Sequence, residues 1–313
     1  MEIVNYVVKR ILQMIPVFLV VTVIIFFVIR LIPGDPAAVM LGTKATPQAL
    51  ASMREKMGLD QPLMVQFFIY LKGLFRFDLG TSIKYNEPVG SLIMSKLGVT
   101  IAFTAVSTCF SAIISFVLGY IGGMKKDKWQ DQIIRLFALF GLSAPTFWIG
   151  LLLLTVFAVN LKILPVAGWG DTFPDHLKGL ILPGITEAVG VSAILIRNLR
   201  NNVIEIKNCD YVEFARSKGL KERDISMKHI VRNALMPTTT LLSLKIAYML
   251  SGSIVIETVF SLPGIGALLV NSIFARDYAV VQGVVLTFVV LVMIINLITD
   301  ILYSILDPRV KLS

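Results

Sequence analysis

The chain has 313 residues, of which 56% are hydrophobic and 16% charged, and its mean hydropathy is +0.81. Soluble domains are about half apolar and about one quarter charged, so this composition excludes an ordinary soluble protein and indicates an integral membrane protein. The net charge of +9 suggests nucleic acid in a soluble protein, but here the basic residues gather in particular loops that set membrane topology, so no nucleic-acid partner is expected. The two cysteines and two histidines have no metal-binding spacing, and no metal site is expected in the chain: Cys109, Cys209, His176 and His229.

Six apolar runs are long enough to cross a bilayer core, which takes about 20 helical residues. The first run, Ile11 to Ile29, follows Lys9 and Arg10 and exceeds the hydrophobic part of a cleaved signal peptide, so we expect an uncleaved span with a cytoplasmic N-terminus. The sequence predicts an all-α integral membrane protein with six transmembrane helices and both termini in the cytoplasm, forming a single transmembrane domain over residues 1–313. The predicted spans are about 11–30, 97–124, 136–161, 179–199, 236–257 and 278–303.

The distribution of lysine and arginine supports this orientation. The cytoplasmic pieces carry 17 of the 29 basic residues, whereas the longer outer pieces carry nine. The density is about threefold higher inside, as the positive-inside rule requires, and the inverted topology is rejected because it places the most basic loop outside. The cytoplasmic pieces are 1–10, 124–135, 197–236 and 307–313, and the outer pieces are 32–95, 162–178 and 257–277.

The outer segment, residues 32–95, is too long for a turn and too short for a substantial separate domain. Thr46 and Pro47 have the pattern of an N-cap and a first helical residue, and Gly58 has that of a helix stop. A second short helix is expected where apolar residues recur every four positions and form one face. It either packs on the spans or lies in the membrane interface, or it helps to cover the outer mouth of a pathway. The apolar residues of this face are Leu63, Phe67, Leu71 and Phe75.

A long polar stretch, Asp210 to Pro237, interrupts the apolar pattern in the second half of the chain. Asp210 with Glu213 three residues later has the geometry of a capping box, and Gly219 suits the left-handed residue that ends a helix. We therefore expect a helix of about two turns before Gly219, and a second, basic helix that runs toward Pro237. The first is expected over Tyr211 to Lys218, and the second from near Lys221.

So short a helix is marginal in water, because helix nucleation is costly. It becomes useful as a rigid knob when the groove of a partner protein holds it. We interpret the loop 203–235 as a cytoplasmic coupling element on which a motor outside this chain acts. The alternative interpretation is an ordinary basic loop that serves topology alone.

Four charged residues lie within or at the ends of the spans, where charge is expensive and by default indicates function. Glu257 and Asp300 lie near span ends, and we expect structural roles for both. Glu187 and Lys245 lie deeper, and either they line the translocation pathway or they pair with one another. Pro145, Pro183 and Gly184 are of types that can distort helices near a cavity, although such residues are also common in ordinary spans.

The polar stretch resembles the EAA loop of binding-protein-dependent ABC importer permeases, in which glutamate is followed by alanine two residues later and by glycine four beyond that. Glu213, Ala215 and Gly219 stand at this spacing. Phe214 replaces the first alanine of the motif, a departure that the peptide-type branch of the family shares. The resemblance implies that the loop couples to an ATPase through Tyr211, Glu213, Phe214, Ala215, Arg216, Lys218, Gly219 and Leu220.

The resemblance extends along essentially the whole chain, through motifs that are weak singly and highly specific in order and spacing. They include L-x-P-G-D-P after the first span, D-L-G-x-S in the outer segment, and E-T-x-F-x-x-P-G-x-G before the last span. The chain is thereby identified as a member of the dipeptide/oligopeptide/nickel permease family, and resembles its B-type subunit. The matching segments are 31–36, 59–70, 78–82, 211–237, 257–266, 276–283 and 307–310.

The resemblance implies half of an importer pore in a bacterial or archaeal cytoplasmic membrane. Its implied partners are a homologous C-type permease, two cytoplasmic ATPases that bind ATP and magnesium, and an extracytoplasmic solute-binding protein. The chain has no G-x-x-x-x-G-K-[ST] sequence, so we expect no ATP site, no enzyme activity, no cofactor and no metal in it. Peptide is the expected cargo, with nickel or a metal chelate as the alternative, because this branch uses one scaffold for both.

Two other classes of protein fit the sequence less well. An autonomous secondary transporter or channel commonly shows internal repeats, and residues 1–160 show no convincing similarity to residues 161–313. An intramembrane enzyme would need a catalytic motif, and neither H-E-x-x-H nor G-x-S-x-G occurs.

Overall fold

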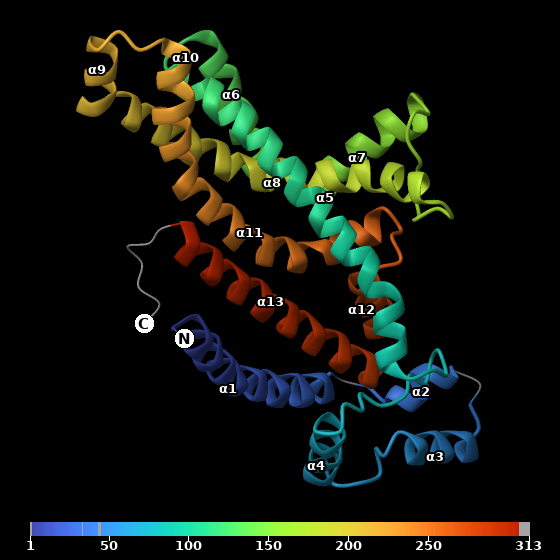
Figure 1. The fold of residues 1–313 in the computed structure, drawn as a ribbon. Helices are drawn as coiled ribbons and strands as arrows, with labels where there is room; N and C mark the ends of the chain where they lie inside the picture. The colour runs from blue at the N-terminus through green and yellow to red at the C-terminus, as the bar shows by residue number, and fades with distance from the viewer. Residues whose placement is uncertain (1, 33, 43–44, 307–313) are drawn as a thin grey trace. The chain divides into compact units, whose positions relative to one another are not determined.

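The computed structural model describes residues 2–32, 34–42 and 45–306, so the motif expected at 307–310 lies outside the described residues. Within them the fold is α-helical and has no strand beyond one isolated β-bridge between Thr81 and Pro88, which confirms the predicted fold class (Figure 1). Among the described residues, five helices are long and apolar enough to cross a membrane, or six if one bent pair counts as a single span. The chain divides into two compact units, Met1–Thr100 with Pro263–Met293, and Ile101–Leu262 with Ile294–Ser313.

The first unit combines three long helices with the short helices of the outer segment. Its long helices are α1 (Glu2–Leu31), the beginning of α5 (Val89–Met124) and the first part of α13 (Tyr278–Leu306), and its short helices are α2 (Pro36–Leu41), α3 (Pro47–Lys56), α4 (Leu63–Leu74) and α12 (Ile265–Phe274). The helix predicted after Thr46 is confirmed, since the hydroxyl of Thr46 accepts a hydrogen bond from the amide of Ala49 at 3.2 Å. Gly58 follows α3 at a φ of +62°, as a helix stop requires.

Helix α4 packs on α1 through aromatic rings. Phe67 and Tyr70 contact Phe26 of α1, with ring centroids 5.0 and 5.7 Å apart. Of the predicted apolar face, Phe67 and Leu71 are partly covered, whereas Leu63 and Phe75 are exposed. The structure therefore favours packing on the spans for this helix.

The second unit is built around α8 (Phe173–Lys207), the most buried of its long helices. Glycines let its neighbours approach closely: a β-carbon on Gly141 would lie 2.8 Å from the carbonyl oxygen of Val189, and one on Gly123 would lie 2.5 Å from Val203. Small residues at helix contacts are typical of membrane proteins. The other helices of this unit are the rest of α5, α6 (Trp129–Ser143), α7 (Thr146–Leu153), η1 (Leu154–Asn160), α9 (Asp210–Ser217), α10 (Glu222–Asp224), η2 (Ile225–Val231), α11 (Arg232–Val259) and the rest of α13.

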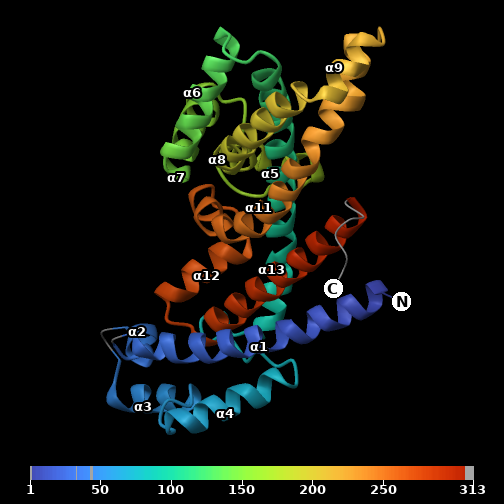
Figure 2. The same cartoon turned by 90° about the vertical axis from the view of Figure 1, so that its left-hand side faces the viewer.

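The third predicted span, residues 136–161, is not one straight helix. Helix α6 ends at Ser143, and the helix formed by α7 and η1 continues at an angle of 111° (Figures 1 and 2). The break lies at Ala144, which is extended, and Pro145, which has no N–H to donate to the preceding turn. Hydropathy shows that the run is apolar, but it does not determine the direction in which the chain continues.

The remaining predicted spans lie inside longer helices. The span expected at 236–257 is part of a continuous helical segment that runs from Glu222 to Val259 through α10, η2 and α11. The basic helix predicted to run toward Pro237 therefore does not end there, because Pro237 is accommodated inside α11. A hydropathy window finds the part of a helix that suits lipid, whereas the helix itself ends where its caps and turn residues stand.

Candidate coupling surface

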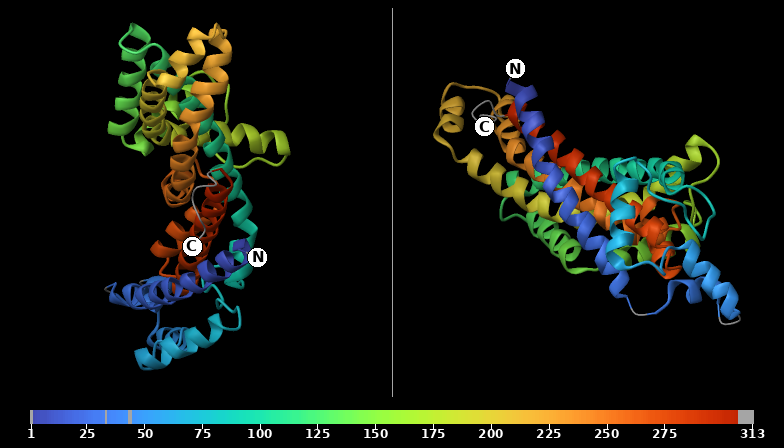
Figure 3. Two further views of the ribbon diagram at one scale, coloured as in Figure 1. Left: turned by 60° about the vertical axis from the view of Figure 1, so that its left-hand side comes forward. Right: turned by 90° about the horizontal axis from the view of Figure 1, so that it is seen from below.

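Helix α9 forms the short helix predicted in the polar stretch, and it lies beside the C-terminal end of α8 (Figures 1 and 3). The predicted capping box is wrong. Cys209 is the extended N-cap residue, no side chain bonds the cap, and Asp210 is the first helical residue. Asp210 and Glu213 instead place two negative charges in the first turn, where they interact favourably with the helix dipole.

Gly219 ends the helix as predicted. Its φ is +75°, and its amide donates to the carbonyl oxygen of Arg216 at 2.9 Å. The amide of Leu220 donates to the carbonyl oxygen of Ala215 at 3.3 Å. A β-carbon on Gly219 would meet nothing within 4 Å. Glycine is favoured here by the left-handed backbone alone, and not by lack of space.

The inner face of α9 is anchored in the core of the second unit. Val212 and Ala215 are 0% and 5% exposed. The alanine of the EAA-like motif is therefore a packing residue within this unit. These two side chains belong to a buried cluster whose other members are Leu199, Val203, Ile225, Ile230 and Ala234.

The outer face of α9 presents large side chains to solvent. Phe214 is 60% exposed, and the ammonium group of Lys218 lies 4.5 Å from its ring centroid. Tyr211 and Leu220 are also exposed. We call Tyr211, Phe214, Lys218 and Leu220 the coupling surface. An exposed aromatic side chain on a short rigid helix is well suited to enter a groove on a partner protein.

Polar contacts hold the coupling surface in place. Arg216 pairs with Glu222 at 2.8 Å and thereby closes the turn around Gly219. The side-chain amide of Asn233 donates to the hydroxyl of Tyr211 at 3.1 Å. The sequence assigned no role to Glu222 or Asn233. The available signal was their position in the basic segment after Gly219, where α10 and α11 return past α9.

Two further polar contacts join neighbouring helices of the second unit. The carboxylate of Asp131 on α6 is fully buried and accepts two hydrogen bonds from Arg200 on α8, at 2.6 and 2.7 Å. The hydroxyl groups of Tyr120 on α5 and Ser226 on η2 lie 2.5 Å apart. Neither contact could be predicted from the sequence, because the partners are 69 and 106 residues apart.

The charged residues predicted for the pathway do not pair. Glu187 on α8 is 4% exposed, and a β-carbon on Gly252 of α11 would lie 2.7 Å from its Oε1 atom. Lys245 lies 5.4 Å from the ring centroid of Tyr248. No ion pair joins Glu187 to Lys245, both of which the structure describes, so the pairing alternative is wrong for this conformation and the pathway role stays a prediction. Glu257 is fully buried near the end of α11, and Asp300 is half-buried.

Residues 114–312 match the family described as "Binding-protein-dependent transport system inner membrane component", and residues 3–104 match the corresponding N-terminal family. The chain belongs to this family. It is thus a permease subunit of an ABC importer, and a component of the inner membrane. Within the described residues of this permease, no three His, Cys, Asp or Glu side chains are grouped so that they would hold a metal ion.

Relatives of this permease are similar over almost their entire length. The glutathione transport system permease protein GsiC of Salmonella choleraesuis (strain SC-B67) is 37% identical over 307 residues, which cover 98% of this chain and 99% of that protein. GsiC of Escherichia coli (strain K12) is 36% identical with the same coverage.

Two solved structures share the fold. The inward-facing MetNI methionine ABC transporter has a TM-score of 0.59 at 17% identity, covering 69% of this chain and 96% of that one. An amino acid ABC transporter crystallised with histidines has a TM-score of 0.53 at 14% identity, covering 69% and 94%.

Proposed function

We propose that this permease forms half of the translocation pore of an ATP-driven importer of di- or oligopeptides, and that α9 is its coupling helix. The observation that carries the coupling role is the division of α9 into two faces. Val212 and Ala215 are buried and pack the helix against its own unit, whereas Phe214 is exposed to solvent. The peptide cargo is supported by the GsiC relatives, whose name assigns them to glutathione transport.

The coupling mechanism follows from that anchoring. Binding of ATP draws the two ATPase subunits together, and α9 moves with the groove that holds it. Because the inner face of α9 packs against α8 and η2, the displacement passes into helices that reach across the membrane. The binding protein then releases solute into the outward-facing pore, and ATP hydrolysis resets the pore.

The remaining parts of the machine are supplied by partners. They are a homologous C-type permease, two cytoplasmic ATPases and an extracytoplasmic solute-binding protein, with the lipid bilayer around the permease pair. ATP and magnesium are bound by the ATPases, so this chain supplies no catalytic residue, cofactor or metal site. Glu187 and Lys245 are the charged side chains proposed to line the pathway.

Replacing Phe214 with alanine tests the coupling surface. We expect binding of the ATPase to the permease pair to weaken about 30-fold, since an anchoring aromatic residue contributes about 2 kcal/mol to an interface. ATP-dependent peptide uptake by proteoliposomes should fall with it. Phe173→Ala is the matched control, because Phe173 is a comparably exposed phenylalanine at the opposite end of α8.

Two results would contradict the proposal. Unchanged ATPase binding and uptake in the Phe214→Ala complex would remove the coupling role from α9. If the complex takes up labelled nickel chelate, and unlabelled di- and tripeptides do not reduce this uptake, the peptide cargo is overturned and the alternative is supported.

A further inference from the structure

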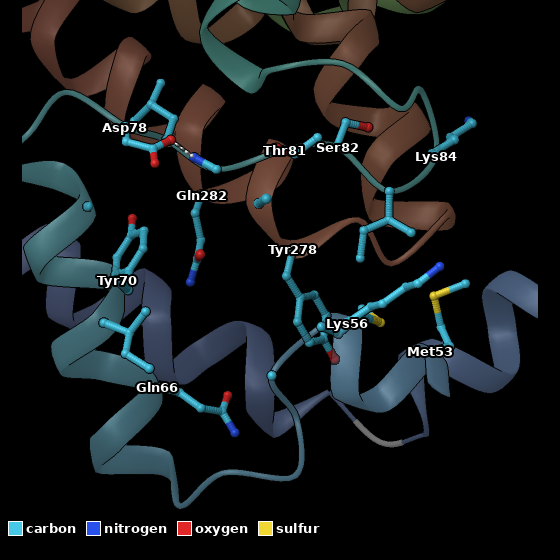
Figure 4. Close-up of a pocket in the computed structure, with 18 of the residues that line it drawn as sticks. Met53, Lys56, Gln66, Tyr70, Asp78, Thr81, Ser82, Lys84, Tyr278 and Gln282 are labelled. Atoms are coloured by element: carbon cyan, nitrogen blue, oxygen red, sulfur yellow. Dashed lines mark hydrogen bonds between the residues drawn. The ribbon is translucent and has the colours of Figure 1, made fainter. Parts of the chain in front are cut away.

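We propose that a cavity of about 750 Å³ in the first unit binds a small solute that carries both a carboxylate and an ammonium group, such as a free peptide. Its walls come from the end of α1, from α3 and α4, from the loop after α4 and from the start of α13 (Figure 4). The volume is in the range of sites that enclose small molecules. The cavity lies outside the coupling surface and has no part in the coupling mechanism described above.

Two polar side chains in this cavity lack the partners that buried groups normally have. Gln282 of α13 is 4% exposed, and its Nε2 atom makes no hydrogen bond. The hydroxyl of Tyr70 on α4 is likewise buried and has no partner. Figure 4 shows the Gln282 side chain extending from α13 into the space that Tyr70, Gln66 and Tyr278 border. Buried polar groups without partners are rare and costly, and here the Gln282 amide and the Tyr70 hydroxyl can each donate to an acceptor.

A positive charge borders the same space. The guanidinium group of Arg30 lies 3.5 Å from the ring centroid of Phe26 and 5.8 Å from that of Tyr278. Its Nε atom donates to the side-chain oxygen of Gln66 at 3.0 Å, and its Nη1 atom donates to the carbonyl oxygen of Phe26 at 3.1 Å. The Nη2 atom has no hydrogen-bond partner among the described residues. Arginine held in this way presents a fixed N–H edge that suits a carboxylate.

Together these groups define an acceptor-binding end of the cavity. Arg30, Gln282 and Tyr70 offer N–H and O–H donors from three different helices, and a carboxylate has two oxygens with about four acceptor positions. Lys56 and Lys84 are exposed lysines that also line the cavity and add positive charge. The arrangement favours an anionic group over a neutral amide.

A single carboxylate among the described lining residues provides the complementary charge. Asp78 lies in the loop after α4, and its Oδ1 atom accepts a hydrogen bond from the amide of Gly80 at 2.8 Å. Its Oδ2 atom stays available for an ammonium group. A free peptide carries a carboxylate at one end and an ammonium group at the other, so it matches Arg30 and Asp78 together. The choice of a peptide rests on the proposed function, whereas the requirement for a carboxylate comes from the cavity.

Binding to the assembled complex, without its solute-binding protein and in phosphatidylcholine nanodiscs, tests the site. We expect dialanine to bind in calorimetry, and dialanine amide and N-acetyl-dialanine to bind at least tenfold more weakly. Gln282→Leu and Tyr70→Phe should each weaken dialanine binding about tenfold. Ser107→Ala is the matched control, because it removes a buried hydroxyl that also has no partner but lies in the second unit, and it should leave binding unchanged.

Thermal unfolding of the same variants separates a ligand site from a structural one. Without peptide, Tyr70→Phe should unfold at the same or a higher temperature than the wild type, since the lost hydroxyl has no partner. A lower unfolding temperature with unchanged dialanine binding would show that these groups hold only structural water, and it would overturn the proposal. So would equal binding of dialanine and its amide, even in a complex that transports peptides.

Displacement of dialanine by phosphatidylglycerol in mixed nanodiscs would assign the cavity to a lipid phosphate and overturn the peptide. A complex that transports no peptide yet shows the expected binding would overturn the function and retain the site.

Discussion

Single buried carboxylates join segments that are far apart in the chain. In the first unit, Asp277 accepts hydrogen bonds from the hydroxyl of Ser82 at 2.6 Å and from the amide of Lys84 at 3.2 Å. In the second unit, Asp131 is held by Arg200. Each carboxylate is fully buried, and a charge in that position is tolerated only with partners. These residues fix the loop after α4 beside α13, and α6 beside α8.

A more exposed ion pair makes the outer segment sensitive to pH. Asp35 caps α2 through the amide of Ala37 and accepts two hydrogen bonds from Arg54 of α3, at 3.0 and 2.7 Å. The hydrogen bonds from Arg54 hold the pKa of Asp35 below its usual value. A lowered pKa means that the pair stabilises the folded state above the ordinary carboxyl pKa of about 4, and that this stabilisation is lost as the pH falls through the lowered value.

The substitution Asp35→Asn isolates this effect, because asparagine keeps the capping oxygen and loses the charge. We expect the variant to unfold at a slightly lower temperature than the wild type at pH 7, and the difference to vanish below about pH 3. Thermal unfolding of the nanodisc-bound permease between pH 3 and pH 7 measures it. The control is Asp60→Asn, at an exposed carboxyl of the same segment for which the structure gives no ion pair. A difference that stayed constant with pH would contradict the assignment.

At the scale of elements, substitution of the left-handed glycine after α9 tests whether this turn serves the binding of the ATPase in addition to stability. Gly219→Ala should cost about 1 kcal/mol, because alanine resists a φ of +75° even where space is open. We expect α9 to fray, and ATPase binding measured by surface plasmon resonance to weaken about fivefold. Gly58→Ala has the same backbone problem and the same open space after α3, so it should destabilise the protein similarly and leave ATPase binding intact. Equal loss of ATPase binding in both variants would exclude a specific role for α9.

The contact of α5 with α8 depends on a glycine that no sequence pattern distinguished. Gly123→Ala would place a β-carbon 2.5 Å from Val203 and 3.0 Å from the carbonyl oxygen of Arg200. We expect a loss of about 2 kcal/mol in stability, because overpacking of this size displaces backbone. Gly98→Ala is the control in the same helix, where a β-carbon meets nothing within 4 Å, and it should be neutral or stabilising by up to about 1 kcal/mol. Chemical denaturation in detergent compares the two, and equal stability would contradict the packing argument.

At the scale of the whole molecule, the chain should be unable to move solute by itself. Proteoliposomes that contain only this permease are expected to accumulate no labelled dipeptide, since the free energy for uptake comes from partner ATPases. Liposomes with the complete complex, binding protein and internal ATP should accumulate it, and this is the positive control. Concentrative uptake by the chain alone would favour a secondary transporter instead.

Features that depend on neighbouring residues could be predicted from the sequence, whereas features that depend on residues far apart in the chain could not. Thr46, Gly58 and Gly219 were predicted correctly, because caps and left-handed turns depend on a few neighbouring residues. The capping box at Asp210 failed by one residue, because Cys209 takes the N-cap position and Asp210 is already helical. The cavity could not be predicted, because Tyr70 and Gln282 are far apart in the sequence and line one space only in the folded chain, where their lack of partners becomes visible.

The break at Ala144 and Pro145 has a consequence for the surrounding lipid. Helix α6 has 15 residues, and α7 with η1 also has 15. At 1.5 Å per residue α6 is about 22 Å long, and the half that contains the π-helix η1 is no longer than that, so each half falls short of a hydrocarbon core about 30 Å thick. Backbone groups at a break cannot face acyl chains, so a locally thinned leaflet or a covering element such as α8, which packs against both α6 and α7, must accommodate this part of the permease. The acyl-chain length of the host membrane therefore becomes a determinant of how well the permease is accommodated.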